Sequence, residues 1–282
     1  MQHLTSITEW RQFAQNTRDA GHRVGLVPTM GALHAGHRSL VQRALDDGNV
    51  PLLTIFVNPR QFNDAADLEA YPQELEEDLA RCQEWGVAGV ATPTVGEMWP
   101  SYPAPTATTV HVAGVTDDFE GAGRPGHFDG VASVVTKIFA ITGVATAYFG
   151  DKDFQQLAMV RQLNDELSLG LDVVGCPIVR EESGLALSSR NARLTTGGRM
   201  RALAISRALI WASQEKRSVQ DIETRVRLTI EDAGGDVAYA TVVDAVTLAP
   251  FVGSGPARLL VAATFDGVRL LDNCPVDVSE KE

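Results

Sequence analysis

The first two-thirds of this 282-residue chain alternate between short apolar runs and segments with helical spacing of apolar residues. The runs typical of buried strands are residues 22–28, 50–57, 87–93, 145–150 and 171–179. The segments typical of helices are residues 37–48, 74–86, 130–143 and 154–170. Alternating strands and helices form βαβ units, whose strands run parallel in a sheet that helices cover on both faces. We therefore expect an α/β fold built on a parallel sheet.

The last third of the chain has a different pattern. Two segments typical of helices are followed by two typical of strands: 195–214, 219–234, 237–248 and 257–272. Inside the last segment, Asp266 and Gly267 form a strong hairpin-turn signal. This order predicts a smaller α+β domain with an antiparallel sheet. We place the boundary before the polar stretch that begins after residue 178, which gives domains of residues 1–178 and 179–282.

Charge and cysteine content limit the function classes. The chain carries 36 acidic and 24 basic residues, a formal net charge of −12, whereas binders of nucleic acid or membrane surfaces present basic stripes. It has no run of about 18 apolar residues that could span a bilayer. Cys82, Cys176 and Cys274 are odd in number and far apart, which favours a reducing cytoplasm over a disulfide framework. We expect a cytoplasmic protein with small-molecule ligands and neither nucleic acid nor membrane partners.

Two histidines, His34 and His37, follow the first predicted strand and stand among the glycines Gly31 and Gly36. A helix that begins after a strand has unpaired N–H groups and a positive dipole end, which together attract anions. Glycines let a phosphate approach the backbone, and imidazoles add further donors. The stretch therefore suits phosphate binding. A glycine-rich turn with two surface histidines and a metal site with two histidine ligands remain alternatives, although no HExxH pattern accompanies them.

The stretch "GDKDFQQL", residues 150–157, joins the end of another predicted strand to a helix. Lys152 supplies a point charge for a phosphate oxygen. Asp153 can cap the helix or hold a ribose hydroxyl, and Gln155 and Gln156 offer donors and acceptors. The alternative interpretation is an ordinary charged first turn of a helix.

Two further segments carry groups that suit an anionic substrate. Ser188, Ser189 and Arg190 combine two hydroxyls and a guanidinium, as flexible polyphosphate-binding loops do; a solvated interdomain loop is the alternative. Gln61, in "FVNPRQF", follows a third strand and could bind a substrate hydroxyl or carboxylate. Ligands of parallel sheets bind beyond the carboxyl ends of the strands. We therefore expect three strand-end clusters to converge: His34 with His37, residues 58–62 and residues 150–153.

Two other stretches have less specific signals. The glycine-rich residues 121–131, with Arg124 and His127, suggest a mobile loop that orders over a ligand. The acidic run 74–79 is typical of a solvated helix face, although Asp78 could reach a magnesium ion, which takes one or two carboxylates together with substrate phosphates.

The order of these motifs is more specific than any one of them. They are "PTMGALHAGH" (28–37), "FVNPRQF" (56–62), "AYP" (70–72), "RPGHFDGV" (124–131), "GDKDFQQL" (150–157) and "SSRN" (188–191). In this order they resemble the pantoate–β-alanine ligase family, within the HxGH nucleotidyltransferase superfamily. The resemblance implies a Rossmann-like N-terminal domain, a C-terminal lid domain and a homodimer. It also implies ATP-dependent joining of pantoate and β-alanine through a pantoyl adenylate, with Mg²⁺ and release of AMP and pyrophosphate.

The resemblance also implies site residues. It assigns ATP binding to Met30, His34, His37, Gly150, Lys152, Asp153, Val179, Leu187, Ser188, Ser189 and Arg190. It assigns the chemistry to His37, as the proton donor, with His34, Lys152 and Arg190. Gln61 and Gln156 correspond to the pantoate binders, and Gln61 also borders the β-alanine site. The family usually has Met at position 187; Leu has a similar volume, so we expect little effect.

Two rival functions remain at this point. A nucleotidyltransferase on the same fold would form a nucleotidyl product without an amine-dependent ligation. A nucleotide-sensing or scaffold protein would bind ATP but never release pyrophosphate. The presence of both the "KDFQQL" and "SSRN" motifs argues against each, because a degenerate site would have lost one of them.

Overall fold

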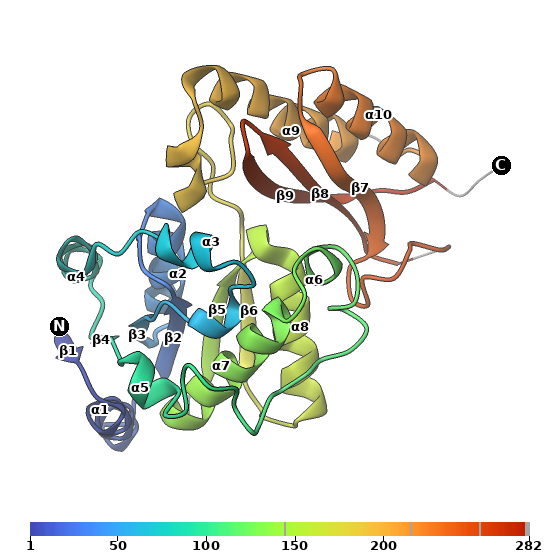
Figure 1. The fold of residues 1–282 in the computed structure, drawn as a ribbon. Coiled ribbons are helices and arrows are strands. Elements are labelled where there is room, and N and C mark those ends of the chain that lie inside the picture. Colours follow the sequence, from blue (N-terminus) through green and yellow to red (C-terminus); the bar gives the residue numbers. More distant parts are fainter. Residues whose placement is uncertain (144, 215, 254, 280–282) are drawn as a thin grey trace. The chain divides into compact units, whose positions relative to one another are not determined.

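The computed structural model describes residues 1–143, 145–214, 216–253 and 255–279 of the chain (Figure 1). Contacts divide it into two compact units. The first comprises Met1–Asp151 and Met159–Cys176, and the second comprises Lys152–Ala158 and Pro177–Glu282. The break after Cys176 lies two residues before the boundary that we expected. The sequence did not predict that Lys152–Ala158 would belong to the second unit.

The first unit contains a six-stranded sheet in which every neighbouring pair is parallel, in the order β1-β4-β3-β2-β5-β6 (Figure 1). The strands are β1 (Gln2–Leu4), β2 (Val24–Thr29), β3 (Val50–Ile55), β4 (Gly89–Ala91), β5 (Thr146–Gly150) and β6 (Asp172–Cys176). The strand order reverses between β2 and β5. In doubly wound sheets the ligand crevice lies beyond the carboxyl ends of the strands at this reversal.

Helices join these strands. They are α1 (Ile7–Asp19), α2 (Ala35–Asp46), α3 (Ala65–Glu69), α4 (Leu75–Glu84), α5 (Val95–Met98), α6 (Glu120–Gly123), α7 (His127–Thr142) and α8 (Phe154–Glu166), with 3-10 turns η1 (Pro59–Gln61) and η2 (Asp151–Asp153). The expected α/β class with a parallel sheet is confirmed. We expected residues 121–131 to form a loop, but α6 and the first turns of α7 occupy most of this stretch, so it is largely helical.

The two faces of the sheet are covered by different helices. Val90 packs into a cluster with Val41 of α2 and Cys82 of α4. A Cβ at the preceding residue, Gly89, would lie 2.9 Å from the ring of Phe13 in α1. Because successive strand residues point to opposite faces, α2 and α4 cover one face and α1 the other. The glycine lets the α1 aromatic ring approach the sheet.

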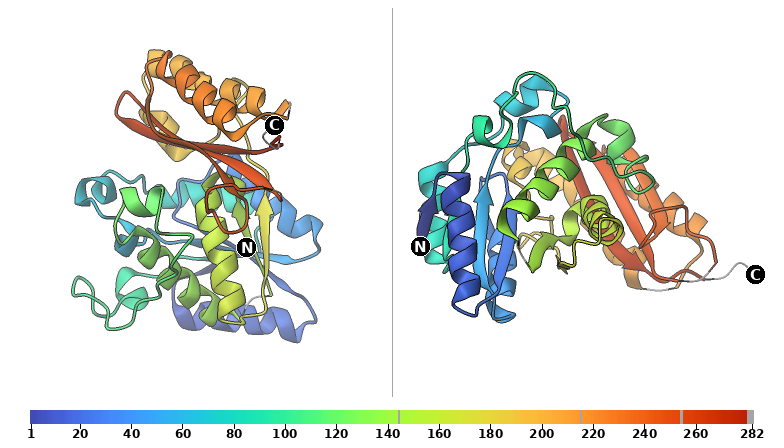
Figure 2. Two further views of the ribbon diagram at one scale, coloured as in Figure 1. Left: turned by 90° about the vertical axis from the view of Figure 1, so that its right-hand side faces the viewer. Right: turned by 90° about the horizontal axis from the view of Figure 1, so that it is seen from below.

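The second unit is a three-stranded antiparallel sheet with two helices on one face (Figure 2). Its elements are η3 (Ser189–Arg193), α9 (Thr196–Gln214), α10 (Val219–Glu231), β7 (Asp236–Asp244), β8 (Ala257–Phe265) and β9 (Val268–Val276). The predicted Asp266–Gly267 hairpin is confirmed, because Phe265 pairs with Val268. The strand predicted over 237–248 ends earlier: the Asp244 carboxylate accepts the amides of Val246 and Thr247 and turns the chain.

Alternation along β8 explains the core of this unit. Leu259, Val261 and Phe265 point to the helices and join their hydrophobic cluster. The residues between them, including Arg258, point to the opposite face.

No helix in the described part of the chain is long and apolar enough to cross a membrane.

Candidate active site

A tight turn follows β2 and sets the start of the predicted phosphate site. Gly31 has a φ of 88°, and a Cβ there would lie 2.9 Å from Asp78 Oδ2. The Asp78 carboxylate accepts the N–H of Ala32 through Oδ2 and that of Leu33 through Oδ1, both at 2.8 Å. Only glycine allows both the left-handed backbone and this close approach. Asp78 therefore fixes the backbone that leads into His34.

The partners of Asp78 do not fit a magnesium ligand. Its side chain is 1% exposed, and its oxygens are engaged by two amides. Arg81 Nη1 lies 3.5 Å from Oδ1 and donates to the Leu33 carbonyl at 2.8 Å, which places a positive charge where a cation would bind. Within the four described ranges, no three His, Cys, Asp or Glu side chains are grouped so as to hold a metal ion. We therefore assign Asp78 to shaping the turn.

Asp78→Asn tests this structural role. The amide group can accept only one of the two backbone N–H groups, and an unsatisfied buried N–H costs about 1–3 kcal/mol. We expect urea unfolding to show a loss of that size, whereas the magnesium concentration that gives half-maximal rate stays the same. If stability were unchanged and the magnesium concentration for half-maximal rate shifted, Asp78 would instead be a metal ligand.

His34 and His37 form a reciprocal cap at the start of α2. His34 is the N-cap residue, and its Nδ1 accepts the Gly36 N–H at 3.1 Å. His37 Nδ1 accepts the His34 N–H at 3.2 Å. The ring centroids are 4.1 Å apart. A Cβ at Gly36 would lie 2.8 Å from the His34 ring, so glycine is what allows the imidazole to fold over the helix start.

This cap specifies the protonation pattern of the two rings. A nitrogen that accepts a backbone N–H is unprotonated, so in each neutral imidazole the proton is on Nε2. Both Nε2–H groups are therefore donors. The caps also occupy the amides of Gly36 and His34, two of the groups that the sequence interpretation offered to a phosphate. An anion at this helix start would meet the imidazole Nε2–H groups in place of those two amides.

Gln61 lies in η1, after β3, and is 9% exposed. Its Nε2 is 3.1 Å from Met30 Sδ, so two predicted site residues are in contact. Asn58 Nδ2 donates to Gln61 Oε1 at 3.1 Å, and His127 Nδ1 lies 2.8 Å from the Gln61 carbonyl oxygen. Asn58 and Met30 thus hold the side-chain amide of Gln61, and His127 holds its backbone carbonyl.

The stretch 124–131 packs against the turn that carries Gln61. Asn58 also donates to the Gly130 carbonyl at 3.1 Å, and a Cβ at Gly130 would lie 2.3 Å from the Arg60 carbonyl oxygen. This glycine lets α7 pack directly against the turn that carries Gln61. The sequence interpretation treated His127 as part of a ligand-covering loop, whereas it supports the backbone of Gln61 from behind.

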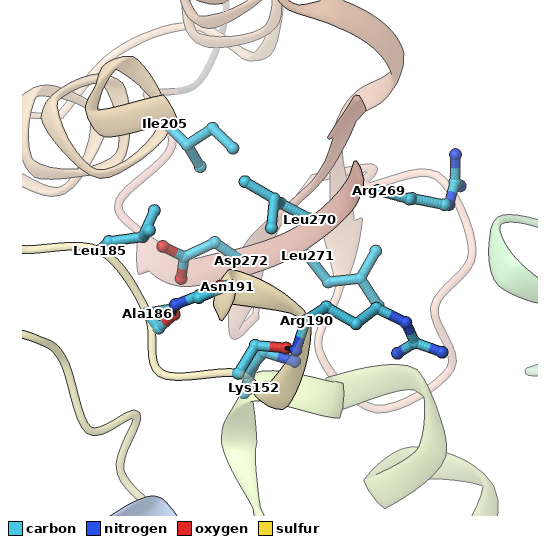
Figure 3. Close-up of a pocket in the computed structure, with 11 residues that line it drawn as sticks. Lys152, Leu185, Ala186, Arg190, Asn191, Ile205, Arg269, Leu270, Leu271 and Asp272 are labelled. Carbon is cyan, nitrogen blue, oxygen red and sulfur yellow. Dashed lines mark hydrogen bonds between the residues drawn. The ribbon is translucent and has the colours of Figure 1, made fainter. Parts of the chain in front are cut away.

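In the second unit, Lys152, Ser188 and Arg190 line one pocket. Figure 3 labels Lys152 and Arg190 among its lining residues. Lys152 comes from η2, and the other two come from the loop before α9. Lys152 Nζ is 3.5 Å from Asp153 Oδ1. Ser188 Oγ accepts the Arg190 N–H at 3.2 Å and so caps η3. Side chains of these three kinds are suited to phosphate oxygens. The rest of the lining includes the Asp272 carboxylate and apolar side chains such as Leu185 and Leu270.

The loop that carries Ser188 is anchored by residues that sequence inspection missed. Asn191, 3% exposed, donates from Nδ2 to Glu181 Oε1 and to the Ala186 carbonyl, both at 2.9 Å. Arg199 Nη1 donates to both Glu181 oxygens, at 2.7 and 2.6 Å. Burial alone would raise the pKa of Glu181, but the hydrogen bonds from Asn191 and Arg199 lower it. Glu181 is therefore an ionised anchor.

Asp153, Gln156, Val179, Leu187 and Ser189 also lie in the second unit, whereas Gly150 ends β5 in the first unit. The Val179 carbonyl accepts the Leu187 N–H at 2.9 Å, so Val179 and the loop that carries Leu187 and Ser188 are two arms of one hairpin. Gln156 lies in the first turn of α8. Met30, His34, His37 and Gln61 belong to the first unit.

Nothing in the sequence pointed to Trp99, which donates from Nε1 to Asn58 Oδ1 at 2.9 Å.

The cysteines do not provide a nucleophile. Burial raises the pKa of the Cys82 and Cys274 thiols to about 12 and that of Cys176 to about 11. All three are unpaired. Thiols with such pKa values are protonated at neutral pH and react poorly.

Comparison with known proteins agrees with the motif order. The family model for pantoate–β-alanine ligase matches residues 2–275. The chain is 47% identical to the pantothenate synthetase of Cereibacter sphaeroides over 97% of this chain and 99% of the relative. It is 46% identical to that of Paracoccus denitrificans over 96% of both chains.

Solved structures give the same result. Pantothenate synthetase from Thermus thermophilus superposes with a TM-score of 0.84 at 38% identity, covering 98% of this chain and all of that one. Pantoate–β-alanine ligase from Francisella tularensis, crystallised with β,γ-ATP and β-alanine, gives 0.81 at 29% identity and covers 98% and 97%. The chain belongs to the pantoate–β-alanine ligase family.

Proposed function

We propose that this enzyme joins pantoate to β-alanine in two steps through an enzyme-bound pantoyl adenylate. The ATP-dependent ligation itself follows from family membership over nearly the whole chain. A carboxylate is a poor acylating agent, so it needs a leaving group before an amine can attack. Transfer of AMP to the carboxylate supplies that leaving group.

In the first step, a pantoate carboxylate oxygen attacks the α-phosphorus of ATP, and the bond to the β-phosphate oxygen breaks. Negative charge develops on the departing pyrophosphate. The Nε2–H groups of His34 and His37 would donate hydrogen bonds to phosphate oxygens. The proton-donor role that the resemblance implies for His37 would need its imidazolium form, in which Nδ1 carries a proton and no longer accepts the His34 N–H. Lys152, Ser188, Ser189 and Arg190 would hold the pyrophosphate. The observation that carries these roles is the reciprocal cap, since it makes both Nε2 atoms donors.

In the second step, the β-alanine amine attacks the acyl carbon of the adenylate, AMP leaves and the amine loses a proton. Gln61 and Gln156 would bind pantoate, and Gln61 would border the amine. The hydrogen bond from Asn58 orients the Gln61 amide, which supports a positioning role. Gly150, Asp153, Val179 and Leu187 would complete the nucleotide site, and a Cβ at Gly150 would meet open space. Such positioning is a large part of catalysis for two bound reactants.

Three further assignments rest on the resemblance. ATP would be used as its Mg²⁺ complex, because phosphates and water supply most ligands of this ion. The enzyme would be a homodimer, which sedimentation velocity tests. It would act in the cytoplasm, in agreement with three unpaired cysteines.

Pyrophosphate release tests the two-step reaction. The purified chain is supplied with ATP, Mg²⁺ and pantoate, and pyrophosphate is measured before and after addition of β-alanine. We expect a pantoate-dependent burst without the amine, and sustained turnover with formation of pantothenate and AMP once the amine is present. Pyrophosphate release that ignores pantoate would favour a nucleotidyltransferase with another acceptor. ATP binding without any pyrophosphate release would favour a sensing protein.

A further inference from the structure

Asn273 connects the C-terminal sheet to the segment that begins with Lys152. Its side chain lies on β9 and is 3% exposed. Nδ2 donates to the Lys152 carbonyl at 3.0 Å, and Oδ1 accepts the Arg258 Nε–H at 2.7 Å. A buried amide with a donor bond on one side and an acceptor bond on the other has a fixed orientation. The peptide after Lys152 is thereby tied to the strand.

Arg258 reinforces this connection from the neighbouring strand. Leu260 of β8 pairs with Asn273, so Arg258 is two residues away from that pair and on the same face of the sheet. Its guanidinium carbon lies 3.9 Å from the ring centroid of Phe154, which is 5% exposed. A guanidinium stacked on a buried ring adds a cation–π attraction. Both ends of the short segment 152–154 are therefore held by one face of the C-terminal sheet.

The backbone of β9 is itself fixed at this point. Asp272 Oδ1 accepts the Asn273 N–H at 2.8 Å. Arg180 forms two bonds to the same carboxylate, at 2.6 and 3.0 Å, and this pairing raises the pKa of Arg180. Asp272 also lines the pocket that contains Lys152 and Arg190 (Figure 3). Strand β9, the loop that carries Ser188 and Arg190, and the segment that begins with Lys152 therefore meet at one pocket.

We propose that Asn273 is a positioning residue for Lys152: its amide holds the Lys152 peptide where this residue lines one pocket with Ser188 and Arg190. The proposal rests on the proposed role of Lys152 toward the ATP phosphates. It explains why Lys152–Ala158 belongs to the second unit although α8 continues into the first. Two charged groups from distant parts of the sequence are thereby assembled in one unit before ATP binds.

Asn273→Asp is the sharpest test because the two side chains have the same shape. The aspartate keeps an acceptor for Arg258, but it presents an oxygen to the Lys152 carbonyl in place of an N–H donor. Repulsion would shift the peptide, and a displacement of about 1 Å can lower a rate by about 100-fold. We expect pantoate-dependent kcat to fall by about 10- to 100-fold. The buried carboxylate also lowers stability, so kcat is measured well below the variant's own thermal unfolding midpoint.

A double-mutant cycle separates positioning from general stability. If Asn273 acts through Lys152, the substitution N273D should cost little more once Lys152→Ala is present, because the group that it positions is gone. Multiplicative losses in the double variant would overturn the proposal. Arg258→Met, which keeps the apolar stem over Phe154 but removes the Nε–H donor, should lower kcat in the same direction and be equally silent in the Lys152→Ala background.

The same series distinguishes the two levels of the proposal. Near-normal turnover of Lys152→Ala would remove the proposed role of the lysine itself. A strong loss in Lys152→Ala together with unchanged kcat in both N273D and R258M would leave that role standing and overturn only the positioning role of Asn273.

Discussion

Lys152→Ala is expected to lower pantoate-dependent pyrophosphate release by at least about 10²-fold, while the protein stays folded. Lys152 shares a pocket with Ser188 and Arg190, and negative charge grows on the pyrophosphate as it departs. A preorganised donor at such a charge contributes most in the transition state, and loss of one typically costs about 10²–10³-fold. Steady-state kcat and KM for ATP, together with the thermal unfolding midpoint, measure the effect.

Lys216→Ala is the matched control, because Lys216 is an exposed lysine of the same unit and lines neither the pocket nor the predicted site. It removes the same charge from the protein and should leave kcat unchanged. Equal losses in the two variants would mean that only net charge matters. Near-normal turnover of Lys152→Ala would remove this residue from the mechanism.

The alternation of apolar runs and helical spacing was sufficient to predict the parallel sheet. Burial on both faces gives strands such as β2 and β3 their continuous apolar sequence. β1 was missed because it has three residues and lies at the edge of the sheet, where pairing with β4 supplies what its short sequence cannot. Local pattern carries no information about such pairing.

The proximity of side chains was predictable where one short motif carries its own geometry. His34, Gly36 and His37 form their cap within four residues, so their spacing already contains the arrangement. Asp78 was assigned to magnesium from its acidic surroundings, but its partners are amides 45 and 46 residues away. Only the fold brings those groups together, and only the fold shows that the carboxylate is already engaged.

The same reasoning applies to the residues behind Gln61. Asn58, Trp99 and His127 contact one another or Gln61 across separations of up to 66 residues. Their sequence context gave no sign of a common task. The residues that hold Gln61 in place come together only through tertiary contacts, which a single sequence does not reveal. Candidate residues at the end of a strand, by contrast, lie together in one short motif.

His37→Ala is expected to slow adenylate formation by at least about 10²-fold, because it removes the Nε2–H donor proposed to act on the departing phosphate. It also removes the acceptor of the His34 N–H, and loss of a helix cap costs about 0.5–2 kcal/mol. Single-turnover pyrophosphate release measures the chemical effect, and urea unfolding measures the structural one. His22→Ala, at an exposed histidine of the same unit, controls for simple loss of an imidazole.

His37→Asn separates the two roles of this residue. Its side-chain oxygen can accept the His34 N–H as Nδ1 does, so we expect stability to recover toward that of the unchanged chain. Asparagine has no donor at the position of Nε2, so pyrophosphate release should stay as slow as in His37→Ala. If activity returned together with stability, His37 would act only as a helix cap, and the donor would have to be sought in His34 or Lys152.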